Sequence, residues 1–297
     1  MRAETAETAG TVTAEPTKLV TRGAHTFETW EYGPAGGELV LLLHGFPQHA
    51  SCWDLVVPLL TAQGYRVVTM NQRGYTPGAQ PPRRRDFKLD DLAADAVAVI
   101  DAYGGAAHVV GHDWGAAVAW GLGMNHPAKV SSLTAVSVPH PQAFLKSMLT
   151  SRQCLASWYM VYFQLPWLPE RGTRATWPRF LGRFGGQSPA VVRRDRGAFA
   201  SPQSLTGPIN WYRALPFTNV MGAAVRVPGP TLFVWSDRDV FLLRKGAETC
   251  GRYVDGPYTY VVLPGVSHWV PDEAPGALAD AVLAHLQRNP ARAPASA

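Results

Sequence analysis

The sequence predicts an α/β fold, with a mostly parallel central sheet and helices on both faces. Short apolar runs alternate along the chain with segments of helical spacing, which is typical of such a sheet. Several runs are continuously apolar rather than alternating, as expected of strands covered on both sides. With 297 residues, 46% of them hydrophobic and 16% charged, the chain is not disordered and has enough length for a sizeable core.

Six apolar runs are predicted to form the parallel part of the sheet, and they span residues 38–43, 65–70, 107–112, 131–138, 230–235 and 258–263. Between the second and third lies a helical pattern over 89–103, which ends at two glycines. Two N-terminal runs, 18–21 and 26–32, flank a glycine turn and predict an antiparallel edge.

Charge divides the chain unevenly and indicates an inserted domain. Residues 138–228 hold eleven basic residues against two acidic ones, a net of +9; since the whole chain carries +5, the remainder carries −4. This stretch is also rich in aromatic residues. We therefore predict an α/β core over 19–138 and 229–297, a mainly helical cap inserted at 139–228, and a flexible N-terminal tail over 1–18.

The basic cap admits more than one interpretation. Its arginines fit a solvated surface that helps the cap dock on the core, and they also fit the steering of an anionic substrate. Arginine with aromatic residues is the composition of a nucleic-acid stacking groove as well, but no nucleic-acid-binding signature accompanies it. We therefore expect no nucleic acid as a partner.

The three cysteines, Cys52, Cys154 and Cys250, match neither a disulfide framework nor a metal-binding spacing. The first eighteen residues contain no apolar leader segment, and no run approaches the roughly 20 apolar residues needed to cross a bilayer. These features predict a cytoplasmic protein with no metal, no cofactor and no membrane partner. They leave a homodimer open.

A motif with the chemistry of a nucleophile follows the third predicted strand. Gly111-His112-Asp113-Trp114-Gly115 has the form Gly-x-nucleophile-x-Gly between a strand and a helix. At a helix N-terminus the Asp113 carboxylate is stabilised, and it can attack carbon to form an ester. An aspartate before a helix is also an ordinary N-cap, so the motif needs partners to be informative.

One such partner is His44-Gly45-Phe46-Pro47, directly after the first buried strand. The backbone amides of Phe46 and Trp114 would form the donor pair of an oxyanion hole. The same residues are also explained by an ordinary Gly-Pro turn with no catalytic role.

An acid and a base complete the set. Asp237 and Asp239 follow the fifth buried strand, and His268 lies in a glycine-containing loop just past the sixth. The chain order is therefore nucleophile, acid, histidine, with Asp113 as the nucleophile.

These motifs make the sequence resemble the α/β-hydrolase superfamily and, within it, the soluble epoxide hydrolases. The resemblance covers nearly the whole chain after about the first twenty residues, and its motifs are those at 44–47, 111–115, 139–141 and 265–269. It places the acid at the end of a Gly-x-x-Asp motif, which maps to Asp239, although Ser236 stands here in place of the glycine. The stretch after the fourth strand, 136–140, offers no carboxylate.

The resemblance further implies two cap tyrosines that bind the leaving oxygen, because a phenol suits an oxygen of high basicity. The segments around Ser157-Trp158-Tyr159 and Asn210-Trp211-Tyr212 place them at Tyr159 and Tyr212. Both tyrosines could instead simply pack in the interior of the cap. Tyr162 is the competing candidate for the first position. Candidates for the substrate pocket are Trp158, Phe163, Trp211 and Trp269.

The expected function is hydrolysis of an epoxide, a small molecule with an apolar or aromatic part, to a vicinal diol. Asp113 would form the alkyl ester, and His268, oriented by Asp239, would activate the water that hydrolyses it. The alternative is a haloalkane dehalogenase with the same nucleophile, in which Trp114 and a cap tryptophan (Trp158 or Trp167) hold the halide. A non-catalytic binding protein on the same fold is the third hypothesis.

Overall fold

A computed structural model of the chain describes residues 15–183, 185–197, 201–218 and 226–291. One eight-stranded sheet runs through the molecule in the order β1-β2-β4-β3-β5-β6-β7-β8. The strands are β1 Lys18–Arg22, β2 His25–Tyr32, β3 Leu39–Leu43, β4 Arg66–Met70, β5 Ala107–His112, β6 Val130–Val136, β7 Thr231–Ser236 and β8 Tyr258–Leu263. The pairs β1–β2 and β2–β4 are antiparallel and the rest are parallel. The predicted parallel sheet and its antiparallel edge are thus confirmed.

Helices connect the strands and cover the sheet. They are α1 Val57–Thr61, α2 Leu89–Tyr103, α3 Trp114–Asn125, α4 Pro141–Thr150, α5 Gln153–Ala156, α6 Trp158–Tyr162, α7 Leu168–Arg183, α8 Pro189–Gly197, α9 Pro202–Arg213, α10 Arg244–Thr249, α11 Val270–Glu273 and α12 Pro275–Arg288. The helix predicted over 89–103 is α2, and Gly104, with φ 141°, ends it as the sequence suggested.

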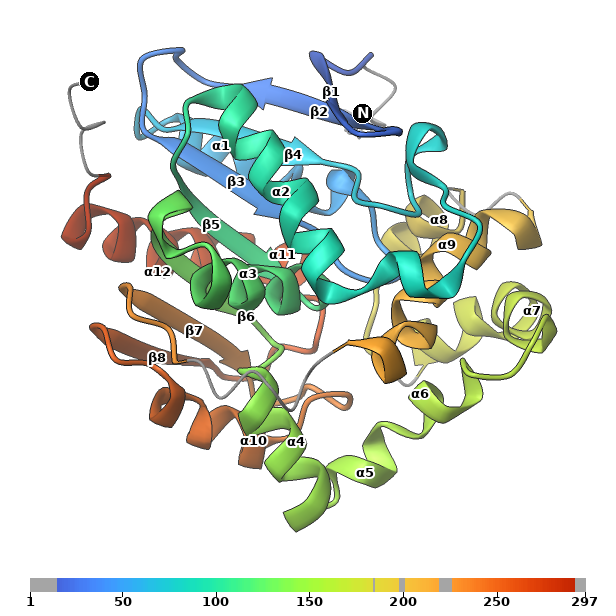
Figure 1. Ribbon diagram of the computed structural model, residues 1–297. Coiled ribbons are helices and arrows are strands. Elements are labelled where there is room, and N and C mark those ends of the chain that lie inside the picture. Colours follow the sequence, from blue (N-terminus) through green and yellow to red (C-terminus); the bar gives the residue numbers. More distant parts are fainter. Residues whose placement is uncertain (1–14, 184, 198–200, 219–225, 292–297) are drawn as a thin grey trace, which may run out of the picture.

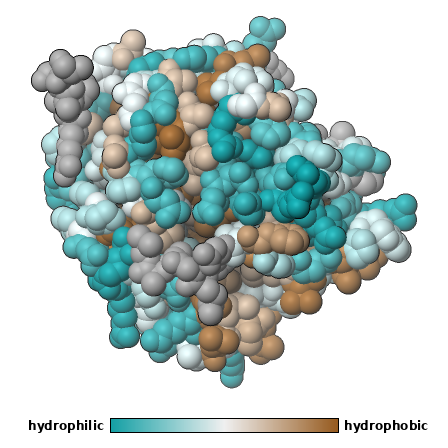
Figure 2. Space-filling view, in the orientation of Figure 1, coloured by the Kyte–Doolittle hydropathy of each residue, from teal (hydrophilic) through white to brown (hydrophobic). Residues whose placement is uncertain are grey.

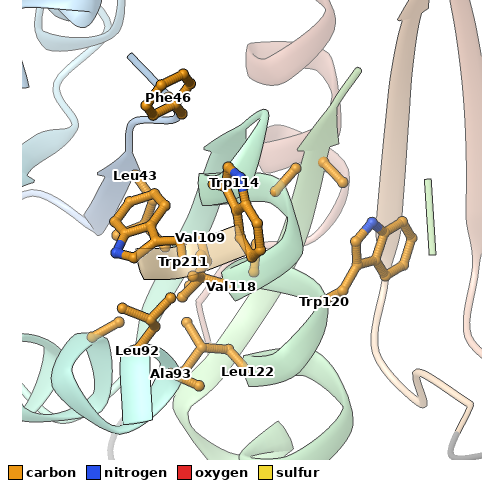
Figure 3. Packing of buried hydrophobic residues seen from close by; sticks show 14 of the residues in the cluster. Leu43, Phe46, Leu92, Ala93, Val109, Trp114, Val118, Trp120, Leu122 and Trp211 are labelled. Carbon is orange, nitrogen blue, oxygen red and sulfur yellow. The ribbon is translucent and has the colours of Figure 1, made fainter. Parts of the chain in front are cut away.

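Alternate residues of the buried strands supply two separate cores. Leu41 and Leu43 of β3 pack with α2 and α3 on one face, and Val40 and Leu42 pack with α1 and α12 on the other. Figure 3 shows Leu43 in the same cluster as Trp114 and Val118 of α3, with Leu92 and Ala93 of α2 farther along. Because successive side chains of a strand point to opposite faces, a strand buried on both sides must be apolar at every position, as β3 is.

Helices α4–α9, which we call the cap helices, are inserted between β6 and β7. Figure 1 shows α6 to α9 grouped beyond the arrowheads of the central strands, at the edge where strand-to-helix loops gather. We keep the borders at 138/139 and 228/229 as a proposed division between core and cap. Lys18, the last residue of the predicted tail, pairs with Thr29 in the edge hairpin; residues 1–14 lie outside the described part.

Candidate active site

Asp113 occupies a strained turn between β5 and α3. Its backbone has φ 53° and ψ −120°, a conformation that residues with a side chain rarely adopt. The two motif glycines make the turn possible: a Cβ on Gly111 would lie 2.1 Å from the carbonyl oxygen of Gly115, and one on Gly115 would lie 2.0 Å from that of Leu43. The turn holds the Asp113 side chain beyond the carboxyl end of β5.

The two oxygens of the Asp113 carboxylate have different partners. The backbone amide of Phe46 donates to Oδ1 at 2.7 Å, and Nε2 of His268 lies 3.6 Å from Oδ2, which is an ion-pair distance longer than a hydrogen bond. Burial by itself would raise the pKa of Asp113. The attraction of His268, together with the Trp114 amide, outweighs burial and lowers this pKa below its usual value.

His268 is held from its other nitrogen by Asp239. The distance from His268 Nδ1 to Asp239 Oδ2 is 2.7 Å, and the second oxygen of Asp239 accepts from the amides of Phe241 (2.8 Å) and Leu242 (2.9 Å). Burial would lower the pKa of His268, but the charges of Asp239 and Asp113 on its two sides raise it to about 10. The predicted nucleophile, base and acid thus lie in one line of contacts.

The second acid after β7, Asp237, is exposed and accepts from the amide of Gly265 instead of the histidine. Ser236, which stands where the related family has glycine, donates its hydroxyl to the carbonyl of Ser267 at 2.7 Å. Ser236 therefore fastens the loop that carries His268, so this departure from the family motif leaves the Asp239–His268 contact in place.

An apolar cavity of about 550 Å³ opens above Asp113. Tyr159 and Tyr212 line it together with Asp113, and their ring centroids are 5.9 Å apart. Burial and the negative charge of Asp113 raise the pKa of both phenols, so both remain protonated donors. Tyr162, the competing candidate, lies outside this lining, and its hydroxyl donates to the carbonyl of Leu168 at 3.4 Å.

The four aromatic residues expected in the pocket do not line this cavity, which corrects the sequence prediction. Trp158 is 51% exposed on the outside of α6, and Phe163 is fully buried behind the cavity, against the rings of Phe46 and Tyr212. The indoles of Trp211 and Trp269 donate to backbone carbonyls inside the protein. Aromatic content alone does not show which helix face turns toward the cavity.

Aliphatic residues form most of the lining instead. One face of α4 contributes at helical spacing, with Pro141, Phe144, Leu145, Met148 and Leu149. Apolar residues recur at spacing i, i+3, i+4, i+7 after the Pro-His-Pro motif, and this periodicity could have predicted that one face of the helix lines the cavity. Sequence reasoning missed it by weighing aromatic residues over periodicity.

Within the described residues no group of three or more His, Cys, Asp or Glu side chains is arranged to hold a metal ion. All three cysteines are free, with Cys154 exposed and the other two buried. Across the same described part of the chain, none of the helices combines the length and the hydropathy needed to span a bilayer.

The fold and the site together define an α/β-hydrolase with a carboxylate at the nucleophile position. The defining features are the strand order, the strained turn after β5, and the acid and histidine on the loops after β7 and β8. A model of the Alpha/beta hydrolase family matches residues 40–281, and the chain belongs to this family.

Relatives by sequence agree with that assignment. The chain is 34% identical over 267 residues to the AB hydrolase superfamily protein YfhM of Bacillus subtilis, covering 86% of this chain and 93% of the relative. It is 33% identical over 264 residues to human epoxide hydrolase 4, covering 82% and 70% of the two chains. Among solved structures, it resembles epoxide hydrolase A from Mycobacterium thermoresistibile, with a TM-score of 0.80, 25% identity and coverage of 93% and 99%.

Proposed function

We propose that this protein is an epoxide hydrolase that converts an epoxide to a vicinal diol through an ester on Asp113. The observation that carries the proposal is the cavity that Asp113 shares with Tyr159 and Tyr212. A carboxylate nucleophile and two phenol donors at one apolar site match an epoxide, whose carbon is attacked while its oxygen leaves. Relatives named epoxide hydrolase support the same substrate class.

In the first step, Oδ2 of Asp113 attacks an epoxide carbon, because Oδ1 is held by the Phe46 amide. A new C–O bond forms, the ring C–O bond breaks, and the electron pair stays on the ring oxygen. That oxygen accepts hydrogen bonds from Tyr159 and Tyr212 and takes a proton from one of them.

In the second step, His268 removes a proton from water and the resulting hydroxide attacks Cγ of the Asp113 ester. Negative charge then develops on Oδ1, where the amides of Phe46 and Trp114 stabilise it. Collapse releases the diol, whose oxygen takes the proton from His268. The hydroxyl left on the Asp113 carboxyl group supplies the proton that restores the tyrosine, so the net reaction consumes one water.

The ester itself prepares His268 for this second role. In the free protein, carboxylates lie on both sides of the imidazole and raise its pKa to about 10, which favours the cation. Alkylation of Asp113 removes one of those charges, so the pKa of His268 falls, its proton passes to solvent, and the neutral imidazole becomes available as a base. Once the Asp113 carboxylate is restored, the imidazole takes a proton back from solvent.

The structure gives less support to a haloalkane dehalogenase. Such an enzyme needs a second halide donor beside Trp114, and the Phe46 side chain packs against the rings of Phe163 and Tyr212 instead of offering one. The candidate cap tryptophans, Trp158 and Trp167, are 51% and 63% exposed and lie outside the cavity lining. A protein that only bound ligands would have no use for the line of contacts from Asp113 to Asp239.

The substrate proposed here is small and mainly apolar, since carbon-rich side chains form most of the cavity wall. Free cysteines at all three positions are compatible with a reducing compartment, and we propose a cytoplasmic location.

The test uses two variants, styrene oxide and intact-protein mass spectrometry. Asp113→Ala should form neither ester nor diol, because no carboxylate remains to attack. His268→Gln should form the ester without hydrolysing it, so that the protein gains the mass of one epoxide. Diol formation by Asp113→Ala at the parent rate, or release of bromide from a bromoalkane in preference to diol formation, would contradict the proposal.

A further inference from the structure

The outer surface of the cap helices carries charge of only one sign. The sequence from 139 to 228 contains two acidic residues, and both are buried in ion pairs, Glu170 with Arg213 and Asp195 with Arg194. The charged side chains that the described cap helices expose are therefore all basic: Lys146, Arg152, Arg171, Arg174, Arg179, Arg183, Arg193 and Arg196. The cap's charge of +9 lies mostly on its outside, facing solvent.

The same helices expose large apolar side chains that a solvated surface does not need. We call this set, which includes the turn between α6 and α7, the cap face, and its members are Leu149, Leu155, Trp158, Val161, Leu165, Trp167 and Leu168. In Figure 2, hydrophobic side chains gather along the lower right edge of the molecule, where Figure 1 places α5 and α6. Scattered single apolar residues are normal on a protein surface, but a group of this size marks an interaction site.

Trp167 shows how the apolar and basic groups are interleaved. Its backbone has φ 47°, a strained value for a tryptophan, and its side chain is 63% exposed. The guanidinium of Arg171 lies over the indole, 5.6 Å from the ring centroid. An aromatic ring exposed to water beside a cation, on a strained backbone, favours a role outside the protein core.

The cap face also joins the candidate active site. Leu149 lines the cavity and is 80% exposed at the same time, so the apolar lining continues onto the outer surface. A ligand that bound the cap face would therefore lie next to the cavity.

We propose that the cap face docks on anionic lipid surfaces. Aliphatic and tryptophan side chains among arginines are what a membrane interface selects, because the apolar groups enter the boundary region while the cations bind lipid phosphates. A second copy of this chain is a poorer partner, since pairing the same face twice would bring two arrays of like charge together. Nucleic acid would match the charge but offers no environment for leucine and valine side chains.

This docking is peripheral and differs from spanning a bilayer, so it revises the expectation of no membrane partner, which rested on the lack of a long apolar run. If the proposed function holds, it also gives an apolar epoxide dissolved in the bilayer a short path to the cavity; that consequence rests on the proposed function. Binding can be measured without substrate, so failure of the one proposal is distinguishable from failure of the other.

The test is co-sedimentation of the full chain with vesicles of neutral phosphatidylcholine, or of phosphatidylcholine with 30% phosphatidylglycerol, at about 0.1 M and 1 M salt. We expect binding to the anionic vesicles at low salt, and its loss at high salt or on neutral vesicles. Neutralising two exposed arginines, Arg171→Gln with Arg174→Gln, should weaken binding roughly 25-fold, at about fivefold for each cation near the surface. The matched control is Arg84→Gln with Arg85→Gln, two exposed arginines of the core.

An apolar variant separates lipid docking from simple charge attraction. Leu155→Ser, Val161→Ser and Trp167→Ser together should reduce vesicle binding by about tenfold or more, whereas Leu19→Ser with Leu55→Ser, on exposed positions of the core, should not. Circular dichroism and turnover of a water-soluble epoxide verify that each variant is folded. The proposal would be overturned by equal binding to both vesicle types or by no binding at all. It would also be overturned by a dimer in ultracentrifugation that the apolar variant abolishes, or by stronger retention on an oligonucleotide than on vesicles.

Discussion

Single residues in the candidate site are constrained from several directions at once. Asp113 is strained in its backbone, fixed at one oxygen by the Phe46 amide and paired at the other with His268. Even the neighbouring Gly45 is limited by it, because a Cβ there would lie 2.4 Å from Asp113 Oδ1. Such convergence on one carboxylate is what a preorganised nucleophile requires, and it costs backbone strain that the surrounding packing must offset.

The proposed tyrosine pair makes the sharpest prediction for single residues. Tyr159→Phe and Tyr212→Phe should each slow formation of the Asp113 ester by about 100-fold, since each removes one donor to the leaving oxygen. Stopped-flow measurement of ester formation, in a background of His268→Gln, reads this step directly.

Tyr162→Phe is the matched control for both tyrosine variants. This phenol lies three residues from Tyr159 but outside the cavity lining, and its hydroxyl donates to the carbonyl of Leu168. A Tyr162→Phe variant as slow as Tyr159→Phe would move the first donor to Tyr162 and contradict the assignment.

Between elements, a partly buried ion pair joins the cap helices to the core. Arg194 of α8 binds Asp272 of α11 through two hydrogen bonds of 2.6 and 3.0 Å. Gln48, two residues beyond the Phe46 amide, donates to both Asp195 (3.2 Å) and Asp272 (2.8 Å). One polar network therefore connects α8, the loop of the proposed oxyanion hole, and the short helix that follows His268. Part of the positive charge of the cap, that of Arg194, therefore helps to hold the cap on the core.

Removing Arg194 should destabilise the protein strongly, because Asp272 and Asp195 would stay buried without their cation. Arg194→Ala is expected to lower the free energy of unfolding by about 3–5 kcal/mol, measured by urea denaturation. Arg193→Ala, the exposed neighbour on the same helix, is the control and should change it by less than about 0.5 kcal/mol. Equal effects of the two variants would show that the network contributes nothing.

Across the whole molecule, buried imidazoles link stability to pH. Burial lowers the pKa of His44 to about 4, of His49 to about 3, and of His112 and His285 to about 4. Each stays neutral in the folded protein while its unfolded form, with a pKa near 6.5, takes up a proton. The stability they contribute is therefore present above pH 6.5 and lost as the pH falls toward 4.

Two buried carboxyls act in the opposite direction. The pKa of Asp54 and of Asp195 is raised by burial to about 6, so the folded state binds their protons first and gains stability on acidification. Four imidazoles against two carboxyls still favour a net loss of stability in acid.

We expect the free energy of unfolding to decrease steadily from pH 6.5 to 4.5. His285→Gln, on α12 and far from the candidate site, should make that decrease shallower by about 1.4 kcal/mol per pH unit, the contribution of one titrating group. Urea denaturation at pH 7, 6, 5 and 4.5 measures the slope. The same slope in the variant and the parent would show that His285 is not buried in its neutral form.

The sequence by itself determined the sheet, the nucleophile turn and the order of nucleophile, acid and histidine. Buried strands must be apolar at every position, and a strained turn between strand and helix needs glycines at fixed spacing, so these features appear in the local pattern. The family resemblance already placed the acid at Asp239 and the first phenol at Tyr159, and the packing of distant segments brings Asp239 against His268 and Tyr159 into the cavity lining. Only the tertiary structure decided which other side chains form the cavity wall. A residue's orientation toward a cavity is set by packing between elements far apart in the chain, and neither composition nor aromatic content encodes it.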